Sequence, residues 1–307
     1  MGHCAAVLYS FWRWYSLSTR NKWMLNLFYV PALIIFFIFV VYPFFNGIRI
    51  SFTNWNGYLP QFKYVGLYNY KLIFTDKTML QVFINTIIYG FGSTIFQNIL
   101  GLAYAVFLNS KFPGRGIIRT IIYIPVMIAP LIMGYIIFFL LQYSGGALND
   151  ARSLFGLVPV NWLGAPWQSI TIIVIANTLQ YAGISMVIYL AGLQNIPAMY
   201  KEAAEIDGAS SWAVFRFVNL PLLMPAITSS VMINLIGGLK LFDIIRALLP
   251  LSPTTGAQSL SSYLVYQYFN VQRAGYSAVI GIFTFIFILI ISIIAMRYFD
   301  NREEQML

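Results

Sequence analysis

The sequence predicts an all-α polytopic membrane protein with six transmembrane helices. Its 307 residues are 60% hydrophobic and only 9% charged, with a mean hydropathy of +0.76. Soluble domains carry about 25% charged residues, with which they cover an apolar interior. This chain has too few polar residues for that, and six of its apolar runs are long enough to cross about 30 Å of hydrocarbon.

The predicted spans alternate with polar loops along the chain and form one transmembrane domain over residues 25–307. The six spans cover residues 25–45, 82–108, 119–141, 169–194, 222–249 and 276–298. The fifth is the least uniform, because its apolar residues are interrupted by Asn234, Gly237, Gly238, Lys240 and Asp243.

Residues 1–24 precede this domain as an N-terminal interfacial segment. They combine Arg13, Arg20 and Lys22 with several aromatic side chains. Basic and aromatic residues together are typical of the membrane–water interface. We therefore expect this segment to lie along the membrane surface, in contact with lipid headgroups.

An even number of spans brings both termini to the same side of the membrane. Basic residues favour the side of the termini and of loops 109–118 and 195–221, and such a bias marks the cytoplasmic side. We therefore predict cytoplasmic termini, with residues 46–81 and 250–275 outside.

The loop at 195–221 is polar and charged, although long apolar runs flank it. It contains three of the nine acidic residues of the chain, and alanines that allow another backbone to approach closely. These acidic and small residues are Glu202, Ala203, Ala204, Glu205, Asp207 and Ala209. The composition predicts a surface that docks onto another protein.

Gly208 and Pro221 indicate the local structure of this loop. Glycine has no Cβ, so Gly208 can adopt the positive φ of a sharp bend between two short helices. Pro221 suits the first turn of the helix that follows, where a missing N–H costs nothing. The sequence therefore predicts a helix, a bend and a second helix, followed by the fifth span.

No constellation typical of an enzyme is present in the sequence. His3 and Cys4 are the only histidine and cysteine, so neither an intrachain disulfide nor a Cys/His metal site can form. No glycine-rich loop ends in Gly-Lys-Ser or Gly-Lys-Thr, and no aromatic-interleaved basic patch suggests nucleic acid. We expect a transport protein that binds no cofactor of its own.

Uncharged polar side chains in the fourth and fifth spans form a candidate substrate path. Amides supply hydrogen-bond donors and acceptors, and aromatic rings stack on sugar faces, so such side chains suit a neutral polyhydroxylated solute. The candidates are Asn177, Gln180, Tyr181 and Asn234, together with Gly238, where a ligand can approach closely, and the charged Lys240. The alternative for the amides is hydrogen bonding between helices. The alternative for Lys240 is an ion pair with Asp243, three residues further along the same helix.

Part of the loop at 195–221 resembles the EAA loop of permease subunits from binding-protein-dependent ABC importers. The resemblance rests on Glu202-Ala203-Ala204, on Gly208, and on Val218-Asn219-Leu220-Pro221. The segments LAGLQNIP (190–197) and YKEAAEIDGAS (200–210) are similar to the carbohydrate-uptake class, which includes maltose and glycerol-phosphate permeases. SFTNW (51–55) and GYSAVIG (275–281) also resemble this class.

The resemblance implies a type I ABC importer permease fold with a cytoplasmic coupling helix, in the bacterial cytoplasmic membrane. It implies three kinds of partner: a second, related permease, two ATPase subunits that hold ATP and Mg²⁺, and an extracellular or periplasmic solute-binding protein. The residues it implies for coupling to the ATPase are Glu202, Ala203, Ala204, Asp207, Gly208, Leu220 and Pro221.

The resemblance also bears on the substrate path. Asn177 matches a sugar-binding asparagine of the maltose-type permease by its spacing from the EAA motif. Tyr181 and Gly238 depart from that permease, which has glycine and asparagine at the matching positions. Import of sugars or oligosaccharides is therefore the function we expect, with another polar solute as the alternative: an acidic oligosaccharide, a polyol or a glycerol-phosphate-like compound. A stand-alone secondary transporter or channel fits less well, because the sequence has a docking loop and no intramembrane proton relay.

Overall fold

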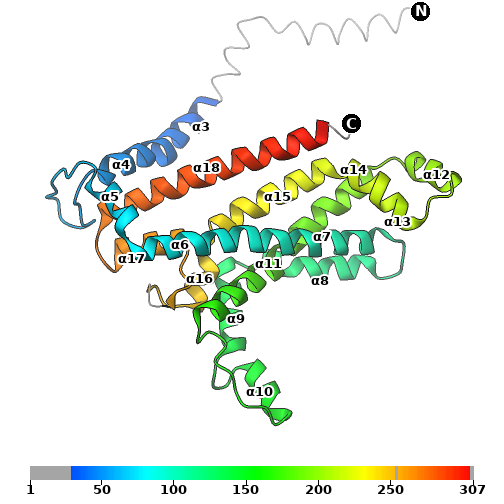
Figure 1. The fold of residues 1–307 in the computed structure, drawn as a ribbon, viewed down its shortest axis with the longest axis horizontal. Helices are drawn as coiled ribbons and strands as arrows, with labels where there is room; N and C mark the ends of the chain where they lie inside the picture. The colour runs from blue at the N-terminus through cyan, green and yellow to red at the C-terminus, as the bar shows by residue number, and fades with distance from the viewer. Residues whose placement is uncertain (1–28, 253–254, 305–307) are drawn as a thin grey trace, which may run out of the picture.

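The computed structural model describes residues 29–252 and 255–304, and these residues form helices joined by turns and loops (Figure 1). The only β-pairing among them is an isolated bridge between Thr53 and Tyr64. The predicted interfacial segment at 1–24 and the first four residues of the first predicted span lie outside the described residues. The all-α prediction is confirmed.

Four helices are long and apolar enough to cross a membrane, and they correspond to the first, second, fourth and sixth predicted spans. Two of them contain a π-helical turn but remain continuous. The four are Tyr29–Ser51 (α3 Tyr29–Phe36, η1 Phe37–Val41, α4 Tyr42–Ser51), Lys77–Asn109 (α6 Lys77–Ile87, η2 Ile88–Gly92, α7 Ser93–Asn109), α11 (Pro166–Asn195) and α18 (Ala274–Glu304).

The third predicted span is a broken pair of helices, so its prediction as one helix over 119–141 is wrong. α8 (Arg115–Met127) and α9 (Pro130–Leu141) meet at an angle of 99°. Proline disfavours the helical conformation in the residue before it, and Ala129, which precedes Pro130, has a ψ of 134°. The chain therefore leaves the helix at Ile128 and starts a new one at Pro130.

The fifth predicted span is also interrupted, so the single helix predicted over 222–249 is wrong. α15 (Met224–Leu239) ends after two successive glycines, which are poor helix formers, and α16 (Asp243–Leu248) begins four residues later. At its other end, α15 meets the helix Ser211–Leu222 at 68°. Counting each bent pair as one span gives up to six spans in the described residues.

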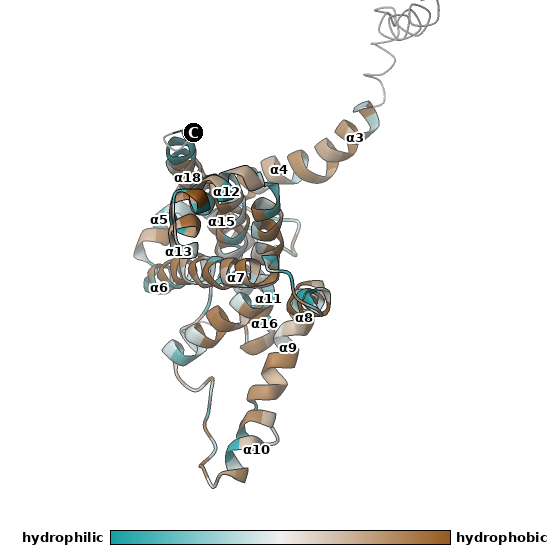
Figure 2. Ribbon diagram, turned by 90° about the vertical axis from the view of Figure 1, so that its right-hand side faces the viewer, coloured by the Kyte–Doolittle hydropathy of each residue, from teal (hydrophilic) through white to brown (hydrophobic). Residues whose placement is uncertain are grey.

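α11 lies at the centre of the bundle, between α7, α8 and α15 (Figure 1). α7 approaches it closely at Gly101, where a Cβ would lie only 2.3 Å from the Cβ of Ser185. Buried side chains next to this crossing, among them Met186, Tyr189 and Leu223, form one of the apolar clusters of the core. α3, by contrast, projects away from the bundle with its apolar side chains exposed (Figure 2).

The shorter helices lie at the ends of the bundle. α12 (Ala198–Ile206) and α13 (Ser211–Val214) occupy one end, and α5 (Tyr68–Thr75) and α17 (Leu260–Phe269) occupy the opposite end (Figure 1). Residues 142–165, here called the arm, extend away from the bundle between α9 and α11 and carry α10 (Ala147–Leu154).

Asp76 holds the end of the bundle that contains α5 and α17. Its carboxylate accepts hydrogen bonds from the hydroxyls of Tyr263 (2.7 Å) and Tyr276 (3.0 Å), and from the backbone N–H of Thr78 (2.9 Å). Burial raises the pKa of Tyr263, and the bond to the Asp76 carboxylate raises it further. Tyr263 therefore remains a neutral donor, and α6 stays tied to α17 and α18.

Candidate functional site

The predicted docking loop has the helix–bend–helix form that its sequence predicts. α12 ends at Ile206, and Gly208 adopts a φ of +82° before α13 begins. The backbone N–H of Gly208 bonds the carbonyl of Glu205 (3.1 Å), and that of Ala209 bonds the carbonyl of Ala204 (2.9 Å), which satisfies carbonyls at the end of α12. The Ser210 hydroxyl then caps α13 by accepting from the N–H of Ala213 (3.3 Å).

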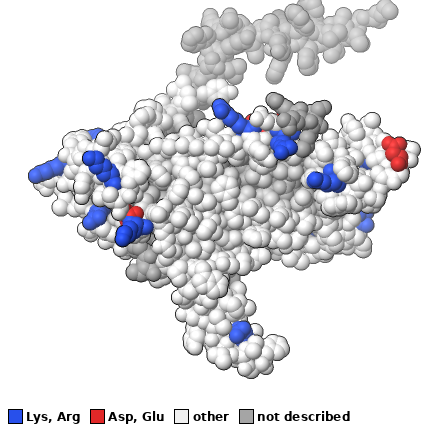
Figure 3. Space-filling model, in the orientation of Figure 1, with Lys and Arg blue, Asp and Glu red and all other residues white. Residues whose placement is uncertain are grey.

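The surface of this loop combines carboxylates with exposed apolar side chains. Glu202, Ala203 and Asp207 are exposed, whereas Ala204, Leu220 and Pro221 are half-buried. Glu205 pairs with Lys201 (3.6 Å), the only ion pair within 4.0 Å between residues that the structure describes, so the Glu202 carboxylate is unpaired. Figure 3 shows acidic side chains gathered at the end of the molecule where α12 lies.

Three large apolar side chains stand out from the same surface. Ile206 is 86% exposed, Trp212 is 70% exposed and Phe217 is 77% exposed. Several large apolar side chains exposed on one short segment, next to charged groups, are typical of an interaction site. The loop at 195–221 therefore offers a partner both apolar contact and negative charge.

The predicted substrate path corresponds to a cavity of about 280 Å³ in the middle of the bundle, here called the inner cavity. All predicted path residues except Gln180 line it. Its lining residues are Gln97, Pro130, Asn177, Tyr181, Ile184, Ile233, Asn234, Gly237, Gly238, Lys240, Leu241, Phe242 and Asp243. α7, α9, α11 and α15, with the break between α15 and α16, thus enclose one polar space.

Asn177 and Asn234 contribute amides to this cavity in different ways. The side-chain amide of Asn177, on a residue only 2% exposed, makes no hydrogen bond within the described residues. Its main-chain oxygen accepts a bond from Gln97 Nε2 (2.9 Å). Asn234 Nδ2 donates to Ser185 Oγ (2.6 Å), so this amide also joins α15 to α11. The Asn177 amide therefore has no partner at the cavity from the described part of the chain, whereas the Asn234 amide has one.

Gly237 and Gly238 differ in what they face. A Cβ on Gly238 would lie 2.9 Å from the Cα of Gly90 and 3.0 Å from the Tyr89 carbonyl oxygen, so this glycine permits close helix packing. A Cβ on Gly237 would meet nothing within 4 Å. Of the two, Gly237 is the one that leaves open space at the cavity.

Gln180, which was predicted to line the path, does not line the inner cavity. Its side chain is fully buried, and its Nε2 donates to the main-chain oxygen of Ile128 (3.0 Å), at the bend between α8 and α9. Gln97 lines the cavity instead and was not predicted. The signal for it is an amide within an apolar run, which Asn85 and Asn98 of the same span also give.

Lys240 and Asp243 both line the inner cavity, and both are exposed. They do not share a helix, because α15 ends at Leu239 and α16 begins at Asp243. The ion pair considered as an alternative is absent from the structure. The cavity thus presents one cation and one carboxylate, in addition to its amides and the Tyr181 hydroxyl.

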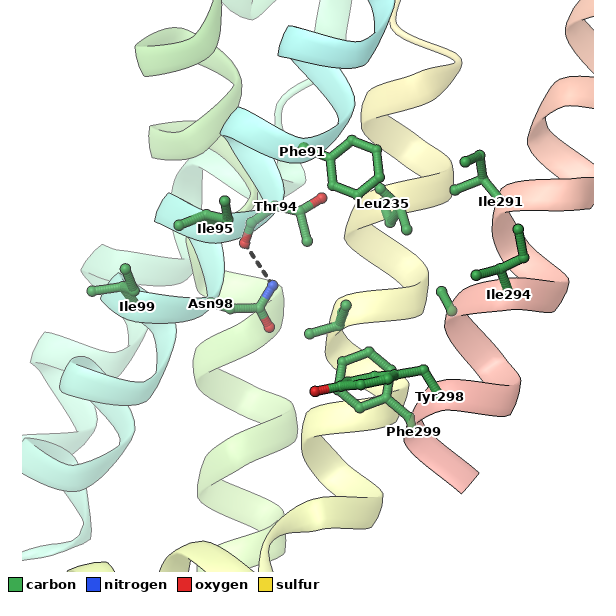
Figure 4. Close-up of a pocket in the computed structure, with 12 residues that line it drawn as sticks. Phe91, Thr94, Ile95, Asn98, Ile99, Leu235, Ile291, Ile294, Tyr298 and Phe299 are labelled. Carbon is green, nitrogen blue, oxygen red and sulfur yellow. Dashed lines mark hydrogen bonds between the residues drawn. The ribbon is translucent and has the colours of Figure 1, made fainter. Parts of the chain in front are cut away.

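A larger cavity of about 540 Å³ between α7, α15 and α18 has the opposite character (Figure 4). Its lining is almost wholly apolar, with Phe91, Leu235 and Ile291 among its side chains. The one amide there, Asn98, donates to the Thr94 carbonyl (2.7 Å) and accepts from the hydroxyls of Ser230 (2.7 Å) and Tyr189. This cavity therefore offers nothing to a polar solute.

No group of acidic, histidine or cysteine side chains within the described residues could hold a metal ion.

Two relatives of this chain are named as sugar permeases. It is 33% identical over 275 residues to the trehalose/maltose transport system permease protein MalF of Thermococcus litoralis, covering 90% of this chain and 93% of that one. It is 32% identical over 289 residues to the arabinooligosaccharides transport system permease protein AraP of Bacillus subtilis, covering 92% and 91%.

The fold is similar to that of one chain of a solved ABC transporter. A chain of a bacterial ABC transporter that imports the acidic polysaccharide alginate superposes with a TM-score of 0.81 at 24% identity, covering 92% of this chain and 96% of that one. Residues 97–305 match the model of the family described as binding-protein-dependent transport system inner membrane component. The match spans more than half of the sequence, and the chain belongs to this family of inner membrane transport components.

Proposed function

We propose that this chain is the permease subunit of an ATP-driven ABC importer that moves sugars or oligosaccharides into the cell. The observation that carries the proposal is the inner cavity, in which the unpartnered amide of Asn177 faces the same space as Gln97 and Tyr181. Buried polar groups without partners are costly unless a ligand or water satisfies them. A polyhydroxylated solute offers the donors and acceptors that these side chains lack.

The chain supplies the path in this proposal, and separate subunits supply the energy. One of the two ATPase subunits docks on the loop at 195–221, where Glu202 is available to an arginine and the apolar side chains of Ile206 and Trp212 are available for burial; the other docks on the second permease. ATP and Mg²⁺ belong to those subunits. Their closure and opening bias the path between outward-facing and inward-facing states, through the different affinity of the ATPase for each state.

Three further features belong to the proposal. A second, related permease completes the path, and a solute-binding protein delivers the sugar from outside. The chain lies in the bacterial cytoplasmic membrane with its termini and the loop at 195–221 in the cytoplasm. Labelling of Ser210→Cys in a Cys4→Ser background tests this orientation: a thiol reagent added outside intact cells should leave the introduced thiol unmodified.

An acidic oligosaccharide is the second candidate substrate, because Lys240 lines the inner cavity without an ion pair. Asp243 lines the same cavity and offsets that charge. A neutral sugar is therefore favoured, since an acidic one would meet both an attractive and a repulsive group.

Uptake into proteoliposomes tests the proposal directly. The complete transporter, with its second permease, ATPase and binding protein, would be offered labelled malto- and arabino-oligosaccharides, a uronide oligosaccharide, and glycerol phosphate. We expect ATP-dependent accumulation of a neutral saccharide. Accumulation without ATP or the ATPase subunits would contradict the coupling, and accumulation of glycerol phosphate alone would contradict the sugar assignment.

A further inference from the structure

A second polar cavity, of about 360 Å³ and here called the outer cavity, lies at the other end of α9 and α16 from the inner cavity. α9 begins with Pro130 in the inner cavity and ends with Leu141 in the outer one, while α16 runs from Asp243 to Leu248 between the same two spaces. The outer cavity is lined by Phe138, Leu141, Gln142, Tyr143, Asn161, Leu163, Gly164, Pro166, Leu248, Leu249, Pro250 and Thr255.

The two cavities are separated by a close-packed pair of helices. A Cβ on Gly134 of α9 would lie 2.5 Å from the Cβ of Ala247 on α16, so the helices touch at this point. The 12 residues of α9 rise 1.5 Å each, which puts its ends roughly 16 Å apart. A monosaccharide can occupy only one of the two cavities, whereas an oligosaccharide of several units is long enough to run alongside this helix pair from one cavity to the other.

Three polar side chains of the outer cavity, one half-buried and two exposed at its rim, make no hydrogen bond to the described residues and are open to a solute. They are the amides of Gln142 and Asn161 and the hydroxyl of Tyr143. The apolar side chains of Phe138, Leu141 and Leu248 accompany them, and no charged side chain lines the space. Amides that donate and accept, a phenol, and apolar surface suit the edges and faces of a neutral sugar.

The rim of this cavity is held in place by Asn149, which is only 2% exposed. Its Nδ2 donates to the carbonyls of Gln142 (3.2 Å), Tyr143 (3.2 Å) and Val160 (3.0 Å). Its Oδ1 accepts from the backbone N–H of Val160 and the indole N–H of Trp162, both at 3.1 Å. This one side chain therefore fixes the two segments that carry Gln142, Tyr143 and Asn161.

Gly164 gives the Asn161 amide its position. A Cβ on Gly164 would lie 2.9 Å from both Cγ and Nδ2 of Asn161, so the amide occupies space that any other residue at 164 would fill. Substitution of Gly164 by alanine is therefore a way to displace the Asn161 amide without removing it.

We infer that the outer cavity is a second saccharide subsite, which binds one part of a neutral oligosaccharide whose other part lies in the inner cavity. The inference rests on the proposed import of sugars and adds to it a preference for length. The chain then distinguishes an oligosaccharide from a monosaccharide by two separated subsites, rather than by the inner cavity alone.

Uptake kinetics for sugars of increasing length test the inference in the complete reconstituted transporter. The variants are the double substitution Gln142→Ala/Asn161→Ala, and Gly164→Ala and Tyr143→Phe singly. We expect the double variant to raise KM by about tenfold or more for a hexasaccharide, because two hydrogen bonds are lost, with KM for the monosaccharide of the same series within about twofold of wild type. Gly164→Ala, which displaces the Asn161 amide, should raise KM for the hexasaccharide in the same direction as the double variant.

Ser144→Ala is the matched control, because Ser144 is exposed in the arm and does not line the cavity. Co-purification with the partner subunits reports whether each variant folds. If the other variants do not assemble, Tyr143→Phe still tests the site, because it removes only the hydroxyl and keeps the shape of the side chain. A wild-type transporter that takes up no saccharide overturns the proposed function and this inference with it. A wild type that transports sugars, with variants whose KM is unchanged or raised equally for all lengths, overturns the inference alone.

Discussion

Gln180 donates a hydrogen bond of 3.0 Å to the main-chain oxygen of Ile128, at the point where α8 ends and the chain turns by 99° into α9. Ile128 follows the last residue of α8, where carbonyls have no helical partner. The bond is partly buried, and Gln180 itself is fully buried. The amide in α11 therefore satisfies a backbone group that the break in the third predicted span leaves open.

Substitution of Gln180 by leucine should destabilise this bend. Leucine has a similar size and lacks the donor, so the carbonyl of Ile128 loses its partner at a cost of about 1–3 kcal/mol. We expect a lower Tm of the purified transporter, measured by thermal unfolding in detergent. Leu179→Gln, on the exposed side of the same turn, serves as the control. An unchanged Tm for Gln180→Leu would mean that the hydrogen bond contributes little to stability.

Gly208→Val should uncouple the permease from the ATPase. At a φ of +82° a β-branched residue is strained by about 1–3 kcal/mol, so the bend between α12 and α13 should shift. Gly114 is a matched control, because it has a φ of +83° and a Cβ there would likewise meet nothing within 4 Å. It lies in a different loop, at 109–118, so the same strain there should not affect docking. We expect Gly208→Val to abolish substrate-stimulated ATP hydrolysis and Gly114→Val to retain it; equal loss in both would refute a specific docking role.

Asn177→Ala and Asn234→Ala should have different effects. The Asn177 amide has no partner within the described residues, so its removal should weaken transport, by about 0.5–1.5 kcal/mol per hydrogen bond to solute, and leave the Tm unchanged. Asn234→Ala breaks the bond to Ser185 and should lower the Tm as well. Uptake assays and thermal unfolding of both variants decide the matter. An Asn177→Ala protein that transports normally but unfolds more easily would assign Asn177 to helix packing.

Lys240→Gln should leave uptake of a neutral sugar within about twofold of wild type. No ion pair holds Lys240, so the substitution breaks no contact that the structure contains, and glutamine keeps a hydrogen-bond donor in the cavity. Uptake of neutral and uronide oligosaccharides is compared in the same preparation. Loss of uronide uptake, in a transporter whose wild type accepts no neutral sugar, would establish the acidic alternative.

Local sequence signals predict the docking loop well because its structure depends on its own residues. Gly208 is the residue that adopts the positive φ, and Ser210 is a strong helix-capping residue, so the bend needs no tertiary contact to specify it. The role of this loop in coupling remains a prediction from its resemblance to the EAA loop.

The path and the broken spans depend on tertiary contacts, so their details could not be predicted. Asn177 and Gln180 are both amides in one apolar helix. Only the helices packed around α11 determine that Asn177 faces a cavity and that Gln180 bonds the carbonyl of Ile128. Pro130 and the pair Gly237-Gly238 signal weak points in a helix, but proline and glycine also occur in continuous membrane helices. Apolar run length therefore predicts where the chain crosses, and not where it bends.

The hydrogen bonds of Asn149 have a consequence for the arm beyond the cavity that they border. These hydrogen bonds join residue 142 to residue 160, at the base of the arm. The tip around Leu154 and Phe155, which are 85% and 81% exposed, lies beyond this connection. A longer or shorter tip should therefore leave the base of the arm, and the bundle below it, in place. The tip is therefore a suitable site for a fluorophore or an affinity tag. Insertions and deletions should also be tolerated there without disturbing the transport path.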